Sequence, residues 1–472
     1  MSARGFADAT ATAAAVRAGE VSAREVVEAA IARIASDDLN AVVAERFDAA
    51  LAEVDAGLPA GPLQGVPTLV KDLGVPVAGL PLTHGSRLWA DHVPTVDSVI
   101  VRRMRAAGMV VLGASNSPEL GKNASTEPLL HGPTRNPWAP THSPGGSSGG
   151  SAAAVSADLV PIAHGNDGGG SIRIPASMCG LFGLKPTRGR VPVHPVPSAL
   201  SSPLSCNHVL TRSVRDSALL LDVLGTPVRG DLAPGPPGPS GESYASCLER
   251  RPSGLRIGLV TARADGGRVD PVVVDAVRRT AMLCEELGHH VTEIAPPYDP
   301  ETMTAGFATL MGVTLLAEVE HRLAELGRDL REEDLEPFTR LMLEHYRATM
   351  TPVQVHDAYA AMQTVSWQVA EAMAGLDLLL TPTLPLPVPE LGVLDTARPE
   401  VMWQRGGDYS SFTAFANLTG QPAMSVPCGL DAAGLPLGAH VVADLHAEGT
   451  LLALAAQLEE AAPGPLLAPV AR

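Results

Sequence analysis

Two glycine-rich turns within residues 143–186 constrain this chain more than any other feature. The first is Gly-Gly-Ser-Ser-Gly-Gly at 145–150, and the second is Asp-Gly-Gly-Gly-Ser at 167–171. Between them, an alanine-rich run at 151–157 predicts a helix, and an apolar run follows at 159–163. Glycine lets the backbone adopt positive φ and approach a ligand closely, and successive amides can point N–H groups at a developing oxyanion. A serine at the end of such a turn stands where a nucleophile is needed.

Three other interpretations of the first turn are weaker. A Gly/Ser linker does not normally run straight into apolar segments on both sides. A phosphate-binding loop would close with Gly-Lys-Ser/Thr, and no lysine follows Gly150. Residues 145–149 also fit the G-x-S-x-G elbow of α/β-hydrolases, but that elbow needs a preceding strand. Residues 136–144 contain three prolines, which argues against a buried strand there.

Three motifs in order resemble the amidase signature family: Gly-Val-Pro-x-x-x-Lys-Asp at 65–72, the turn at 145–150, and Gly-Gly-Ser-Ile-Arg-Ile-Pro at 169–175 with Cys-Gly-Leu-Phe-Gly-Leu-Lys-Pro-Thr at 179–187. The resemblance implies an α/β fold, with a large mixed twisted β-sheet covered by helices on both faces. It also implies a Ser–cis-Ser–Lys triad. Carried over to this sequence, Lys71 is the base, Ser147 is the bridging serine after a cis peptide, and Ser171 is the nucleophile.

The same resemblance assigns supporting roles near the triad. The amides of Gly168, Gly169, Gly170 and Ser171 would form the oxyanion hole, although the family usually carries Thr or another side chain where this chain has Gly168. In the polar loop at 121–128, we assign Asn123, Ser125 and Thr126 to substrate binding. Ser148 is interpreted as structural. Arg173 could bind a substrate carboxylate, but a salt bridge to Asp167 is the favoured interpretation.

Lys71 can act as a base only when it is neutral, because an ordinary lysine has a pKa of about 10.4 and stays protonated. Burial penalises the charged form, and the preceding Thr68-Leu69-Val70 run is of the kind that buries a strand end. An isolated lysine at a strand end would more often lie on the surface. Here the three-motif resemblance favours the buried base.

The composition excludes several classes of function. With 472 residues and a net charge of −17, the chain lacks the basic surface of a nucleic-acid-binding protein or of one that binds an anionic membrane. We found no apolar run of membrane-spanning length and no signal peptide. Five scattered cysteines without a C-x-x-C motif argue against disulfides and zinc sites. We therefore expect a cytoplasmic protein that needs no metal or organic cofactor.

The chain is expected to form a single domain over residues 1–472, with its catalytic core at about 63–193. A Pro/Gly-rich stretch at about 226–254 predicts a surface excursion. Strand–helix alternation supports the α/β interpretation. We expect helices at 8–18, 22–35, 47–56, 96–107, 209–224, 270–287, 317–326 and 333–349, and strands at 40–45, 68–71, 109–114, 255–260 and 376–380.

The leading functional hypothesis is an amidase that cleaves a small, largely uncharged amide. The runs at 102–108, 126–128 and 164–176 resemble those of 6-aminohexanoate-cyclic-dimer hydrolases, which are nylon-oligomer amidases, so cyclic or linear amide oligomers are candidate substrates. Alternatives are the amidase subunit of a tRNA-dependent amidotransferase, an aryl or aliphatic acylamidase of secondary metabolism, and an inactive binding or scaffold protein. The intact triad argues against the last. A homodimer is compatible with the sequence.

Overall fold

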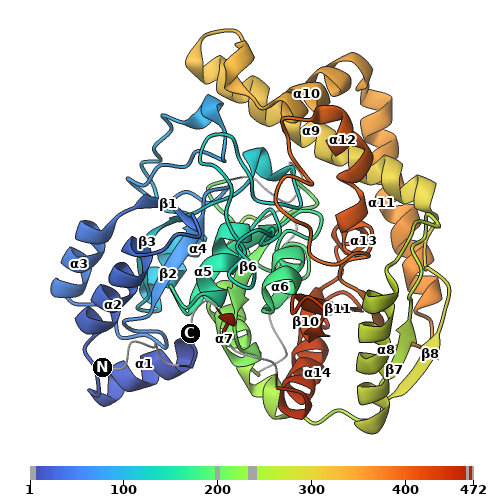
Figure 1. The fold of residues 1–472 in the computed structure, drawn as a ribbon, viewed down its shortest axis with the longest axis horizontal. Coiled ribbons are helices and arrows are strands. Elements are labelled where there is room, and N and C mark those ends of the chain that lie inside the picture. Colours follow the sequence, from blue (N-terminus) through green and yellow to red (C-terminus); the bar gives the residue numbers. More distant parts are fainter. Residues whose placement is uncertain (1–6, 197–201, 232–241, 464–466, 470–472) are drawn as a thin grey trace.

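A mixed β-sheet runs through the centre of the protein (Figure 1). A computed structural model describes residues 7–196, 202–231, 242–463 and 467–469. The sheet has eleven strands in the order β1-β3-β2-β4-β6-β5-β10-β11-β9-β7-β8, with parallel pairs around β2 and β7 and antiparallel pairs elsewhere. This confirms the predicted large mixed sheet. The strands are β1 Val42–Glu45, β2 Pro67–Lys71, β3 Val110–Ser115, β4 Ile162–Asp167, β5 Phe182–Lys185, β6 Cys206–Thr211, β7 Arg256–Leu259, β8 His290–Glu293, β9 Leu378–Pro382, β10 Ala423–Leu430 and β11 Pro436–Ala443.

Helices cover both faces of the sheet, as expected. Successive strand residues point to opposite faces, so neighbours in one strand enter different cores. In β2, Val70 belongs to the apolar cluster that also holds residues of α1, α4, α7, α8 and α14, whereas Leu69 belongs to the cluster that holds residues of α2, α3, α5 and α6. In β9, Leu379 packs with α9, α11 and α13. The helices are α1 Ala9–Ala18, α2 Ala23–Ala35, α3 Phe47–Asp55, α4 Val99–Ala106, α5 Gly149–Ser156, α6 Arg173–Cys179, α7 Val214–Leu224, α8 Pro271–Glu286, α9 Pro300–Leu326, α10 Pro337–Thr349, α11 Pro352–Ala372, α12 Pro399–Arg405, α13 Ala414–Thr419 and α14 Glu448–Ala461.

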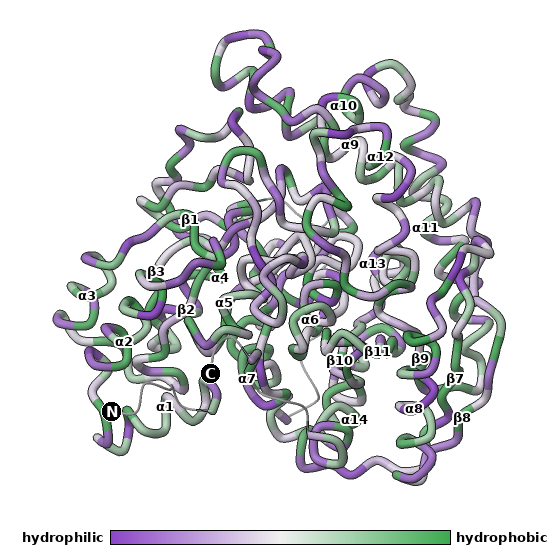
Figure 2. Tube along the Cα trace, in the orientation of Figure 1, coloured by the Kyte–Doolittle hydropathy of each residue, from purple (hydrophilic) through white to green (hydrophobic). Residues whose placement is uncertain are grey.

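The N-terminal and C-terminal parts of the chain meet inside the sheet. Strand β5 pairs with β10 through Lys185, Leu184 and Gly183, so a strand from the glycine-rich region lies beside one that follows hundreds of residues later. Helix α6 packs across β5, β10 and β11. Hydrophilic residues gather on outlying turns such as the one after α9 (Figure 2).

Three element predictions differ from the structure. Residues 209–224 were expected to form one helix, but they hold the end of β6 and then α7, because the apolar stretch at 206–211 pairs with β4 and β5. The helix expected at 317–326 is the last part of the much longer α9, and α11 was not predicted. Of the predicted surface excursion, residues 232–241 lie outside the described residues, and its described end contains a short 3-10 helix at Ala245–Glu249.

Helix α9 is long and apolar enough to cross a membrane by length and composition alone. A core helix of a folded protein meets the same criterion. The structure gives another reason for its composition. The helix packs against α10, α11 and α13, and other apolar side chains on it line the cavity described below.

Candidate active site

Strand β2 ends at Lys71, which lies in the interior of the protein. All five residues of β2 are buried, because the strand lies between β3 and β4. The Lys71 side chain is enclosed at 1% exposure, and its Nζ lies 2.6 Å from Ser147 Oγ. It also donates a hydrogen bond to Asn166 Oδ1 at 2.6 Å. Burial lowers the pKa of Lys71 well below its ordinary value, against the opposing charges of Asp167 and Asp72.

The first glycine-rich turn is rigid and closely packed. The peptide bond between Gly146 and Ser147 is cis, as the resemblance implies. A Cβ on Gly146 would come within 2.6 Å of the Asn123 carbonyl oxygen, and one on Gly150 would come within 2.4 Å of the Asn116 nitrogen. The glycines are therefore needed for close backbone approach, which excludes the flexible-linker interpretation. Ser148 donates to the Asn166 carbonyl at 3.2 Å, away from Lys71, in keeping with a structural role.

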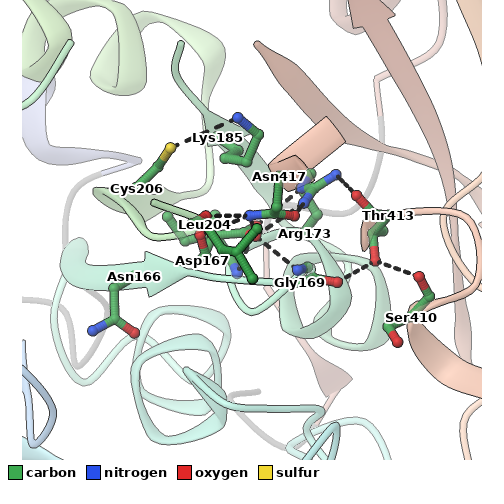
Figure 3. A network of polar contacts seen from close by, with 12 residues as sticks. Asn166, Asp167, Gly169, Arg173, Lys185, Leu204, Cys206, Ser410, Thr413 and Asn417 are labelled. Carbon is green, nitrogen blue, oxygen red and sulfur yellow. Dashed lines mark hydrogen bonds and ion pairs between the residues drawn. The ribbon is translucent and has the colours of Figure 1, made fainter. Parts of the chain in front are cut away.

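The second turn is fixed by the Asp167 carboxylate (Figure 3). Asp167 accepts hydrogen bonds from the Gly170 amide at 2.7 Å and from the Ile172 amide at 3.1 Å. It also forms a fully buried salt bridge with Arg173 at 2.9 Å, which confirms the favoured interpretation of Arg173. Burial opposes ionisation of Asp167, but the charge and hydrogen bonds of Arg173 outweigh it and hold the pKa of Asp167 below its usual value.

A residue before α13 and one within it hold the same turn from the far end of the chain (Figure 3). Thr413 Oγ1 donates to the Gly169 carbonyl at 2.6 Å. Asn417 Nδ2 donates to both the Asp167 carbonyl and its carboxylate, and Asn417 Oδ1 accepts from Arg173. Gly170, at φ +129°, leaves no room for a side chain, since its Cβ would meet Thr413 Oγ1 at 2.3 Å.

These contacts divide the amides of the turn into two groups. The Gly170 N–H is already taken by Asp167, which removes Gly170 from the predicted oxyanion donors. Within the described part of the chain, the amides of Gly168, Gly169 and Ser171 have no hydrogen-bond partner. Space is open beside Gly168, so the larger residue usual there would fit, and its absence leaves the amide in place.

A cavity of about 620 Å³ opens onto the two predicted catalytic serines and the second glycine-rich turn. Ser147, Ser171, Gly168 and Gly169 line one wall. The opposite wall comes largely from α9 and is mainly apolar, with contributions from Met303, Phe307, Ala308, Met311 and Leu315. Such a cavity is suited to a small, largely apolar ligand whose reacting group lies at the two serines.

The amidase family model matches residues 25–452. The chain belongs to the amidase family. It is an enzyme of the amidase signature type that hydrolyses amide bonds, and the predicted family and activity are confirmed.

Characterised relatives match this amidase over nearly its whole length. It is 39% identical to the 6-aminohexanoate-cyclic-dimer hydrolase of Paenarthrobacter ureafaciens, over 97% of this chain and 95% of that protein. A solved structure of 6-aminohexanoate cyclic dimer hydrolase complexed with substrate superposes with a TM-score of 0.90 at 36% identity, covering 98% of both chains. A bacterial aryl acylamidase superposes with a TM-score of 0.87 at 31% identity, covering 97% of this chain and 96% of that one.

Of the three residues predicted to bind substrate in this amidase, one lines the cavity and two do not. Asn123 lines the cavity, and its Nδ2 donates to the Leu394 carbonyl at 2.8 Å. Ser125 and Thr126 are fully buried outside the cavity. The Ser125 hydroxyl bonds Glu127 and Ser143, and the Thr126 hydroxyl bonds Gly145, so both stabilise the first glycine-rich turn and do not face a substrate.

The sequence interpretation missed Asn166, Thr413 and Asn417. Asn166 follows His164 by two residues on β4, and the alternation of a strand could have placed it on the face toward Lys71. No local signal pointed to Thr413 or Asn417, which act across more than 240 residues of sequence. His164, the next candidate for the base if Lys71 were not one, lies outside the cavity lining and accepts the Lys71 backbone N–H at Nδ1, and burial lowers its pKa to about 3. Among the residues that the structure describes, no cluster of three His, Cys, Asp or Glu side chains could hold a metal ion.

Proposed function

We propose that this amidase cleaves its substrate through an acyl-enzyme on Ser171, with Ser147 and Lys71 as the proton relay. The observation that carries the proposal is the 2.6 Å contact between buried Lys71 Nζ and Ser147 Oγ, at the wall of a cavity that also exposes Ser171. Lowering of the Lys71 pKa by burial supplies the neutral amine that a base requires.

The proposed steps pass one proton between Ser171, Ser147, Lys71 and the leaving amine. Ser147 gives its proton to Lys71 and takes the proton of Ser171, whose oxygen attacks the amide carbonyl carbon. The oxyanion accepts hydrogen bonds from the amides of Gly168, Gly169 and Ser171. The proton then returns through Ser147 to the leaving amine, and the C–N bond breaks. Water, deprotonated by the same relay, hydrolyses the ester and restores Ser171.

The substrate is a small, largely uncharged amide, because the wall opposite the two serines is mainly apolar. Cyclic or linear amide oligomers such as the 6-aminohexanoate cyclic dimer are the leading candidates, on the likeness to hydrolases of that name. Aryl amides are the second candidate, on the likeness to an aryl acylamidase. We further propose that the protein acts on a small molecule as one domain of 472 residues, in the cytoplasm, and without a metal or organic cofactor, and a homodimer is compatible with this function.

The test combines a substrate panel with mass spectrometry of the intact protein. We expect turnover of cyclic dimers, linear oligomers or aryl amides, and a covalent acyl adduct on Ser171 when the reaction is quenched early. Ser171→Ala should lose both the adduct and the turnover, whereas Ser148→Ala, the neighbouring structural serine, should keep the adduct on Ser171. An adduct on Ser147, or full turnover by Ser171→Ala, would refute the assignment. Co-purification with a partner subunit and ammonia-dependent activity would favour the amidotransferase alternative.

A further inference from the structure

Two side chains of opposite charge, Lys122 and Glu318, line the cavity near the mainly apolar residues of α9. Lys122 follows the 3-10 helix Glu119–Gly121, and Glu318 lies on α9. Both line the cavity. Within the described residues, neither side chain has a hydrogen-bond or ion-pair partner, and the catalytic relay does not use them.

Both side chains are partly buried in the wall of the cavity. Burial lowers the pKa of Lys122, and the charge of Glu318 opposes that shift. Burial raises the pKa of Glu318, and the charge of Lys122 opposes it in turn. The charges of Lys122 and Glu318 thus interact, although the two side chains form no ion pair. A partly buried polar group without a protein partner is stabilised by a ligand that hydrogen-bonds it, so a ligand that reaches both groups would gain from them.

Helix α9 separates Glu318 from the residue that packs against the nucleophile turn. The Phe307 ring lies against Gly169 of the nucleophile turn. Glu318 lies eleven residues further along α9, which at the rise of an α-helix is about 16 Å. Gly121, next to Lys122, lies against Ser147 Oγ, and Leu120 packs in one apolar cluster with Leu315 and Val319 of α9. The segment that carries Lys122 therefore adjoins both the catalytic serine and the part of α9 that carries Glu318.

We propose that Lys122 and Glu318 form a distal subsite for an uncharged group that both accepts and donates hydrogen bonds, a carboxamide being the simplest. The carbonyl would accept from Lys122, and the N–H would donate to Glu318. Each singly charged group would meet one attractive and one repulsive partner, so the subsite disfavours ammonium and carboxylate ends. The inference rests on the proposed function, since it describes the far end of the same substrate. The preferred substrate is therefore an elongated amide with a second, uncharged polar group.

The test uses matched N-alkyl amides whose far end is a carboxamide, a methyl, an ammonium or a carboxylate group. One series carries this end on the acyl chain and a second series carries it on the amine chain. In the wild type, we expect kcat/KM to be highest for the carboxamide in one series, by about tenfold over the methyl compound. Equal values for all four ends in both series would overturn the proposal.

Variants separate the two charges. Lys122→Met should shift the preference toward the ammonium end, and Glu318→Gln toward the carboxylate end, because each leaves the other charge alone. The double variant Lys122→Met/Glu318→Gln carries no unpaired charge, which guards against misfolding of the single variants, and it should favour the methyl end. Glu320→Gln, an exposed change on α9 outside the cavity lining, is the matched control and should keep the wild-type order. A double variant with the wild-type order would contradict the proposal.

Calorimetry separates the subsite from the chemistry. The same ligands are titrated into the Ser171→Ala protein, which needs no turnover. Tighter binding of the carboxamide compounds without any hydrolysis by the wild type would support the subsite and refute the proposed function. Hydrolysis of every compound at similar rates, with equal affinities, would support the function and refute the subsite.

Discussion

Lys71 shows how the environment of one residue decides its chemistry. The side chain is an ordinary amine, but its enclosure at a buried strand end disfavours the charged form. A residue that must be neutral to work makes activity rise with pH on the acidic limb. The limb should lie well below the ordinary range of a lysine, because burial lowers the pKa of Lys71.

We therefore predict that Lys71→Ala lowers kcat by about a thousandfold or more and removes the acidic limb. Lys71→Arg should not restore activity, since arginine stays protonated at working pH. The measurement is kcat/KM from pH 5 to 10 for the wild type and both variants. An arginine variant that keeps both the rate and the limb would show that Lys71 is not the base.

Ser147 carries a second prediction at this scale. Because its hydroxyl is the contact between Lys71 and the cavity, Ser147→Ala should lose about as much kcat as Lys71→Ala, and the double variant should lose little more. Kinetics of the two single variants and the double variant test this. Fully additive losses would mean that the two residues act independently and not as one relay.

At the scale of elements, α13 and the residue before it hold the nucleophile turn from a distance. The Thr413 hydroxyl fixes the Gly169 carbonyl, and so the direction of the neighbouring amides. Thr413→Val keeps the shape but loses this hydrogen bond. We expect kcat to fall by about tenfold with little change in KM, because the amides act on the transition state.

Thr413→Ser is the matched control and should recover most of kcat. Thermal unfolding of both variants shows whether the loss is only one of stability. A rise in KM at unchanged kcat would contradict the positioning role of Thr413.

A buried pair of carboxyl groups connects the loop before Lys122 to α10. Glu119 accepts from Ser86 Oγ and from the Glu336 amide, while the Glu336 carboxyl accepts from the Leu129 amide. Burial, with the nearby charge of Glu336, raises the pKa of Glu119 to about 8. The folded state thus favours protonated Glu119, so its stabilising contribution is complete below its ordinary value of 4.5 and is lost as pH rises through about 8.

The free energy of unfolding should accordingly decrease between about pH 4.5 and pH 8, and Glu119→Gln should flatten this dependence. Denaturant unfolding at several pH values tests it, with exposed Glu45→Gln as the control. If Glu119→Gln and the wild type keep the same slope of stability against pH, Glu119 is not the titrating group.

At the scale of the whole molecule, the sheet connects parts of the chain that are distant in sequence. The pairing of β5 with β10 and the packing of α6 across both leave no natural division between an N-terminal and a C-terminal unit. One core extends from Ala9 in α1 to Leu458 in α14. We predict a single cooperative unfolding transition, in which the calorimetric and van't Hoff enthalpies agree. Two resolved transitions in calorimetry would show instead that the chain unfolds as two units.

The sequence by itself determined the fold class and predicted the catalytic triad. Lys71, Ser147 and Ser171 each belong to one of the short motifs that resemble the amidase signature family, so that resemblance assigns their roles before the motifs are placed in space. The same local reasoning failed for residues 206–224, where an apolar stretch next to a helical one looks continuous. Only the pairing of β6 with β4 and β5 divides them, and strand pairing is a property of distant residues.

Tertiary structure alone decided which amides and hydroxyls are already used in hydrogen bonds within the protein. The Gly170 amide is used by Asp167, the Ser125 and Thr126 hydroxyls are used by neighbouring loops, and Thr413 reaches Gly169. Lys122 and Glu318 share one cavity although nearly 200 residues separate them. Hydrogen-bond occupancy, burial and electrostatic coupling depend on the three-dimensional neighbours of a group, and residue type and sequence spacing do not specify those neighbours.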